Sequence, residues 1–110
     1  MKSESHFIAL LTYVSSEKGG RSTPASSGYR PTIKFPFEQG MFTGIQNFIG
    51  TDLVFPGDVV NAEITLLSAE HLVGKIYAGL DFEFFEGTNL IGHGVITKML
   101  SADLINKSNE

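Results

Sequence analysis

Residues Val60–Leu66 read VNAEITL, and apolar and polar side chains alternate without interruption along this stretch. A β-strand places successive side chains on opposite faces, so a period of two is typical of a strand that is buried on one side. The tetrapeptide FPGD, Phe55–Asp58, comes shortly before it. Proline fixes φ at the second position of a turn and glycine accepts a positive φ at the third, which predicts a type II turn leading into the strand.

Other apolar runs recur along the chain between turn signals, and none has the spacing of an amphipathic helix. They predict further strands at Phe7–Val14, Thr32–Phe37, Thr43–Phe48, Lys75–Phe85 and Leu90–Leu100. The side chains expected inside are Phe7, Ala9, Leu11, Val60, Ala62, Ile64, Leu66, Phe82 and Phe84. Because Ser15–Gly28 is polar and rich in small residues, it is expected to be a long loop. Short strands joined by Gly and Pro turns favour an all-β barrel or sandwich.

The chain has 110 residues, 42% of them hydrophobic, which fits one domain with one core. We expect an N-terminal segment at 1–6, a β domain at 7–100 and a solvated tail at 101–110. There is no cysteine, so disulfides, thiolate metal sites and thiol nucleophiles are excluded. The first residues lack the apolar run of a signal peptide, and no stretch approaches the ~18 apolar residues of a membrane helix. We therefore expect a soluble, cytoplasmic protein without membrane contact.

Charge is distributed unevenly along the chain. Residues 1–34 carry five basic side chains against two acidic ones, whereas residues 35–97 carry Lys75 alone against eight acidic side chains. The net charge is −4 and the pI is about 5.3. Proteins that bind nucleic acid strongly usually present a basic face and a high pI. The sequence therefore predicts at most a weak RNA interaction, confined to the first third of the chain.

Four short motifs follow one another in a fixed order: GGRSTP at Gly19–Pro24, YRP at Tyr29–Pro31, PGD at Pro56–Asp58, and the pair Glu86-Gly87 with GHG at Gly92–Gly94. This order resembles the third, C-terminal β-barrel domain of the elongation factor Tu family of translation factors. The resemblance runs from Phe7 to Leu100. It implies a stand-alone domain whose fold is all-β, a closed antiparallel β-barrel of about six strands.

The resemblance also implies where RNA would bind. In that family the domain performs no chemistry; it packs against the GTPase domain and lies along the T-stem of aminoacyl-tRNA. Arg21, Thr43 and Glu86 keep the family residue type at T-stem positions, while Ser22 and Thr32 are shorter than the family residues. With the neighbouring basic side chains, the RNA-binding candidates are Lys18, Arg21, Arg30, Lys34, Thr43 and Glu86.

Two arginines of these motifs also have a structural interpretation. The guanidinium group can bond several loop carbonyls or a carboxylate at once, a geometry that lysine cannot reproduce. We expect Arg21 and Arg30 to be structural anchors first and ligand contacts second. Their candidate partners are Glu17, Asp58 and Glu86.

No catalytic or cofactor motif is present. The segment Gly74–Gly79 has the glycine spacing of a phosphate loop but continues with Leu80-Asp81, which supplies neither the lysine nor the hydroxyl that such a loop needs. His6, His71 and His93 fall in different segments without the spacing of a metal pair. We expect no enzyme activity, no GTP, no metal and no cofactor.

The first predicted strand is apolar on both faces. Ile8 and Leu10 lie on the face opposite Phe7, at positions that are commonly acidic in the resembled family, and Phe85 matches an arginine there. Such a face needs a cover: the chain's own tail, a second copy or another protein. Ile8, Leu10 and Phe85 are therefore the protein-interface candidates. The sequence predicts a translation-related, non-catalytic protein-binding module or homo-oligomer; the alternative is a tRNA-binding domain that uses the basic first third.

Overall fold

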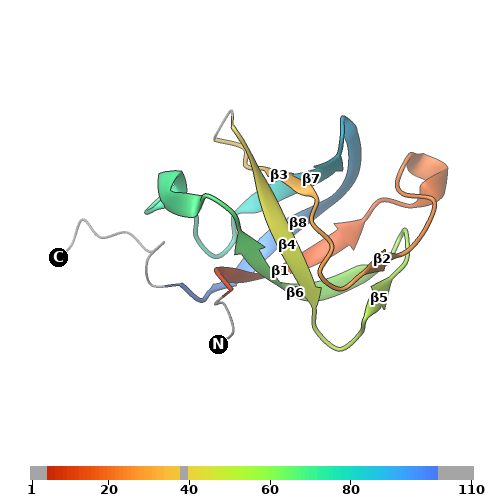
Figure 1. The fold of residues 1–110 in the computed structure, drawn as a ribbon, viewed down its shortest axis with the longest axis horizontal. Helices are drawn as coiled ribbons and strands as arrows, with labels where there is room; N and C mark the ends of the chain where they lie inside the picture. The colour runs from red at the N-terminus through yellow and green to blue at the C-terminus, as the bar shows by residue number, and fades with distance from the viewer. Residues whose placement is uncertain (1–4, 38–39, 102–110) are drawn as a thin grey trace.

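The computed structural model describes residues 5–37 and 40–101. Its described part is a closed antiparallel barrel with the strand order β1-β6-β4-β3-β7-β8 (Figure 1). These strands span β1 Phe7–Tyr13, β3 Thr32–Lys34, β4 Met41–Phe48, β6 Val59–Leu66, β7 Asp81–Glu86 and β8 Asn89–Met99. The predicted all-β barrel of about six strands is confirmed.

Smaller elements lie outside the barrel wall. A two-stranded sheet joins β2 Ala25–Ser26 to β5 Leu53–Val54, and two 3-10 turns, η1 Ser16–Lys18 and η2 Ala69–Leu72, lie in connections. Within the described residues, no helix has the length and apolar character needed to cross a membrane.

The stretch Val60–Leu66 forms most of β6, at the centre of the wall between β1 and β4. Its alternation produces the core, since Val60, Ala62, Ile64 and Leu66 are all buried while Asn61 is exposed. Facing residues of the other strands complete the interior. All nine side chains predicted to lie inside are buried: Phe7, Ala9, Leu11, Val60, Ala62, Ile64, Leu66, Phe82 and Phe84.

The predicted type II turn precedes β6. Gly57 has a φ of +92°, and the Asp58 N–H donates to the Phe55 carbonyl at 2.9 Å. The Asp58 carboxylate accepts a further hydrogen bond from the Phe55 N–H at 3.0 Å. The acidic side chain therefore fixes the turn, which brings the chain beside Tyr13.

Three of the expected boundaries are wrong. The strand predicted at Lys75–Phe85 begins only at Asp81, because the preceding residues form turns with positive φ at Gly74 and Gly79. The strand predicted at Thr32–Phe37 ends at Lys34, two residues before Pro36, which has no N–H to donate to a ladder. The loop predicted at Ser15–Gly28 contains η1 and β2.

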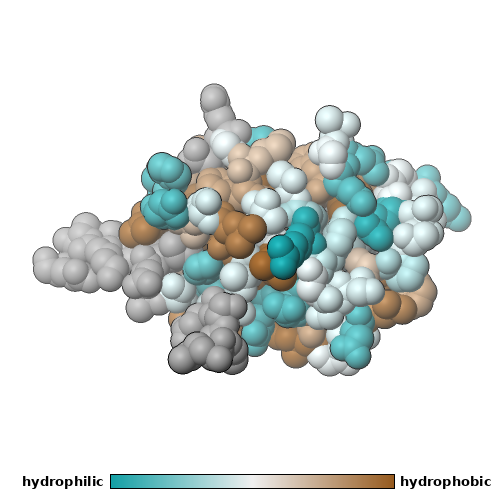
Figure 2. Space-filling view, viewed as in Figure 1, coloured by the Kyte–Doolittle hydropathy of each residue, from teal (hydrophilic) through white to brown (hydrophobic). Residues whose placement is uncertain are grey.

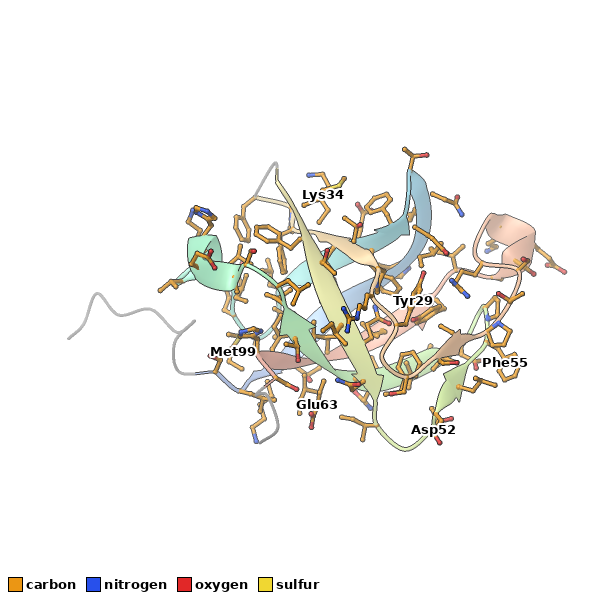
Figure 3. The ribbon with its side chains drawn as sticks, in the orientation of Figure 1. Tyr29, Lys34, Asp52, Phe55, Glu63 and Met99 are labelled. Atoms are coloured by element: carbon orange, nitrogen blue, oxygen red, sulfur yellow. The ribbon has the colours of Figure 1, made fainter. Side chains whose placement is uncertain are left out.

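The ends of the domain meet at one end of the barrel. The Leu100 and Ser101 N–H groups both donate to the His6 carbonyl, at 2.9 and 3.1 Å, so part of the expected N-terminal segment is attached to the barrel wall. Met99 and Phe55 lie toward opposite sides of the molecule, on the left and on the right in Figure 3. The expected tail at 101–110 lies, apart from Ser101, outside the described residues, as do residues 1–4.

Candidate functional site

Arg21 holds the long loop against the closing hairpin of β7 and β8. Its Nη1 donates to Glu86 Oε1 at 2.9 Å, and its other nitrogens donate to Thr23 O, Thr23 Oγ1 and Pro24 O, each at 3.2 Å. The guanidinium carbon also lies 4.7 Å from the centre of the Tyr29 ring, whose hydroxyl donates to Glu86 Oε1 at 3.1 Å. Arg21, Tyr29 and Glu86 together are called the Arg21 clasp below.

The residues before Arg21 explain how the loop reaches this position. Gly19 takes a φ of +98°, and its carbonyl accepts a hydrogen bond from Asn89 Nδ2 at 2.9 Å. A Cβ at Gly20 would overlap the Val14 carbonyl group. The two glycines thus allow the chain to turn back closely on the end of β1, and this turn delivers Arg21 to the hairpin.

The clasp confirms one of the two expected arginine anchors. Only 17% of the Arg21 side chain is exposed. Burial by itself would lower the pKa of Arg21, but the interactions with Tyr29 and Glu86 outweigh it and raise the pKa. The expectation for Arg30 is wrong: it is exposed and forms no hydrogen bond or ion pair with another described residue.

Arg21→Lys is expected to lower the melting temperature by several degrees, a loss of about 1 kcal/mol in a domain of this size. A lysine cannot bond Glu86 and the Thr23 and Pro24 carbonyls at the same time. Thermal denaturation followed by circular dichroism measures the change, and Arg30→Lys is the matched control, which should melt like the unaltered chain. Equal melting of the two variants would contradict the anchoring role.

A buried polar pair lies inside the barrel next to the clasp. The Tyr13 hydroxyl donates to Gln46 Oε1, and Gln46 is fully buried. Burial, with Tyr29 as the next contributor, raises the pKa of Tyr13 far above its usual value. Gln46 Nε2 has no hydrogen-bond partner among the described residues. The sequence analysis missed this pair, although position 46 shares the inward parity of Phe42, Gly44 and Phe48.

A groove of about 590 Å³ lies on the outside of the barrel, across β1, β8, β7 and the end of β3. We call it the outer groove. Its lining includes the side chains of Leu10, Thr12, Lys34, Asp81, Glu83, His93 and Val95. Strand register aligns them in two rows: Leu10 opposite Val95 and Val95 opposite Asp81, then Thr12, His93, Glu83 and Lys34 in turn.

The expected interface residues do not all line the outer groove. Leu10 is 36% exposed and lines the outer groove, whereas Ile8 is half-buried, between Glu63 on β6 and Lys98 on β8. Phe85 is half-buried and pairs with Leu90, beyond Glu83 along β7. Among the three candidates, Leu10 alone lies in the groove.

The RNA-binding candidates are spread over several parts of the barrel. Arg21 and Glu86 are brought together, but they bond each other. Lys18 is exposed in η1, Lys34 lines the outer groove, and Thr43 lies opposite Thr32 in a second, shallower depression beside Met41, Leu67 and His71. Within residues 5–37 and 40–101, no three His, Asp or Glu side chains are grouped so that they could hold a metal ion.

No protein-family model matches this chain. The motifs that resemble the elongation factor Tu domain have the following places in the structure: GGR forms the turn into the clasp, Tyr29 of YRP contributes its ring and hydroxyl to the clasp, PGD forms the turn into β6, and Glu86 accepts the clasp hydrogen bonds. Each motif thus has a local structural role.

Proposed function

We propose that this chain is a non-catalytic binding module that contacts another protein through the outer groove. The observation that carries the proposal is the position of Leu10. A large aliphatic side chain points out of the barrel wall into a groove, next to Val95 and a row of polar side chains. Concave surfaces that combine apolar area with a few convergent polar groups are the usual form of binding sites.

The outer groove occupies one side of the barrel wall. Over β4 and β6, the near face in Figure 2 is a mosaic of polar and apolar side chains. The groove lies on the other side, over β1, β7 and β8. The resemblance to the elongation factor Tu domain, which works by contact with other macromolecules and not by chemistry, supports a binding role and a translation-related one for the proposed module.

An RNA-binding role has weaker support. Two of its six candidate residues, Arg21 and Glu86, are engaged with each other, and the pI near 5.3 disfavours a broad basic face. Lys18 and Arg30 remain exposed on the loop side. A tRNA contact would have to begin with these two side chains.

Site-specific photo-cross-linking in cells tests the proposal. A photoreactive residue at Thr12, in the outer groove, is expected to give one discrete protein adduct, and the same residue at exposed Asn47 on β4 is expected to give none. The captured protein is then purified and titrated with the intact chain and with Leu10→Glu. Affinity should fall about tenfold or more, because the variant puts a charge where Leu10 would be covered.

Three other outcomes decide against this reading. If Leu10→Glu binds the captured protein as tightly as the unaltered chain does, the outer groove is not the interface. A dimer in light scattering that disappears in Leu10→Glu would identify a second copy as the occupant. Retention of tRNA on a filter, lost when Lys18 and Arg30 are both changed to alanine, would establish the RNA-binding alternative.

A further inference from the structure

One row of the outer groove ends in a carboxylate. Leu10, Val95 and Asp81 are direct neighbours on β1, β8 and β7, and all three lie on the outer side of the wall. Neighbouring strands lie about 4.8 Å apart, so Asp81 is roughly 10 Å from Leu10 across the row. The floor of the row is therefore aliphatic over two strands and anionic on the third.

Among the described residues, Asp81 has no basic residue directly opposite it in the strand register, unlike Glu83. Glu83 lies between His93 on one side and Lys34 on the other. Asp81 has Val95 on one side, and β3 ends at Lys34 before it reaches the level of Asp81 on the other. The Asp81 carboxylate forms no hydrogen bond or ion pair with another described residue. A partner that covered this row with apolar groups alone would desolvate the Asp81 carboxylate without supplying a counter-charge or a hydrogen bond.

We propose that the outer groove binds a lysine or arginine side chain of the partner protein. Its aliphatic stem packs on Leu10 and Val95, and its cationic end pairs with Asp81. Long cationic side chains commonly lay their methylene groups along apolar surface while the charge reaches a polar partner, and hydrogen bonds between ionised groups are the strong ones. The charged side chains that line the outer groove are Asp81 and Glu83 against Lys34, a negative formal balance that favours a cation.

The partner chemistry inferred here rests on the proposed protein-binding function and makes it specific. A glutamate or aspartate of the partner would meet Asp81 and Glu83, two carboxylates that lie two residues apart on the same outer side of β7. A partner leucine would cover Leu10 but leave Asp81 without a counter-charge. The row therefore selects a side chain that is apolar along its length and positive at its end.

Nuclear magnetic resonance titration of the intact, ¹⁵N-labelled chain tests the proposal. The probe is N-acetyl-lysine methylamide, and the matched control is N-acetyl-norleucine methylamide, which keeps the aliphatic stem without the ammonium group. The lysine probe is expected to shift the amide signals of Leu10, Asp81 and Val95 in a saturable way. Binding of the norleucine compound should be weaker by about fivefold or more, the size expected for one charge-assisted contact.

Two variants give the matched comparison. Asp81→Asn is expected to weaken binding of the lysine probe by the same factor. Asp52 is an exposed acid at the far side of the molecule from Lys34, so Asp52→Asn should leave this binding unchanged (Figure 3). Absence of saturable shifts, equal binding of the two compounds, or an unchanged titration in Asp81→Asn would overturn the inference.

If binding of the cross-linked partner depends on Leu10 but not on Asp81, the inference fails and the protein-binding function stands. If the lysine probe binds at Asp81 but Thr12 captures no protein, the cation-binding property of the groove stands and the proposed protein-binding function fails.

Discussion

Gly92→Ala is expected to destabilise the barrel by about 3 kcal/mol or more, the largest effect among the changes considered. Gly92 points inward on β8 beneath the Phe84 ring, and a Cβ at this position would overlap that ring. Phe84 is itself fully buried and packs edge-on against Tyr13, so it has little room to move. Urea denaturation of the variant and of the unaltered chain measures the loss.

Two further variants separate this clash from a general effect on β8. His93→Ala, at the next and outward-facing position, should change the free energy of unfolding by less than about 0.5 kcal/mol. Phe84→Leu added to Gly92→Ala should recover part of the loss, because a smaller side chain makes space for the methyl group. If the double variant is less stable than Gly92→Ala alone, the overlap with Phe84 is not the cause.

Tyr13→Phe is expected to cost about 2 kcal/mol, because it leaves the Gln46 side chain buried with neither of its polar atoms bonded. Tyr13→Phe combined with Gln46→Met removes both polar groups with little change in volume. We expect the double variant to be more stable than Tyr13→Phe alone, since burying a polar group without a partner costs more than burying an apolar one.

A double-mutant cycle measured by urea denaturation gives the coupling between the two side chains directly. Gln46→Met by itself supplies the fourth corner of the cycle. The pair has no stabilising role if the two single changes simply add.

The core could be predicted from the sequence because alternation alone determines which side chains face inward. The failure at Lys75–Leu80 shows the limit of that reasoning. Ile76 and Leu80 are buried, as an apolar run suggests, but they lie in irregular backbone next to turns and outside any strand. Gly79 and Leu80 are joined to Ile96 by two backbone hydrogen bonds without forming a strand. Burial and strand geometry are separate properties, and an apolar run reports only the first.

The candidate site was less accessible to sequence reasoning. Arg21 and Glu86 were both singled out, yet their contact spans 65 residues and depends on how the loop folds back. The outer groove depends on register across four strands, and β-bulges between Ile8 and Ala9 and between Phe84 and Phe85 shift that register. A bulge changes which outward side chains become neighbours while leaving the apolar alternation of each strand nearly intact. Asp81 next to Val95 could therefore be found only in three dimensions.

The pairing of β1 with β8 has a consequence for how the chain folds. The first strand of the barrel finds its partner in the last one, so the seam between Phe7 and Met99 joins residues 92 positions apart. Closing such a long loop lowers the chain entropy before native contacts form to compensate for that loss. Proteins whose contacts are mostly between distant residues therefore fold slowly. During synthesis, the edge of β1 that pairs with β8 keeps its backbone groups unpaired until β8 has left the ribosome. Over that interval the apolar strand Phe7–Tyr13 is open to pairing with other chains, and the risk of aggregation depends on how quickly the seam closes.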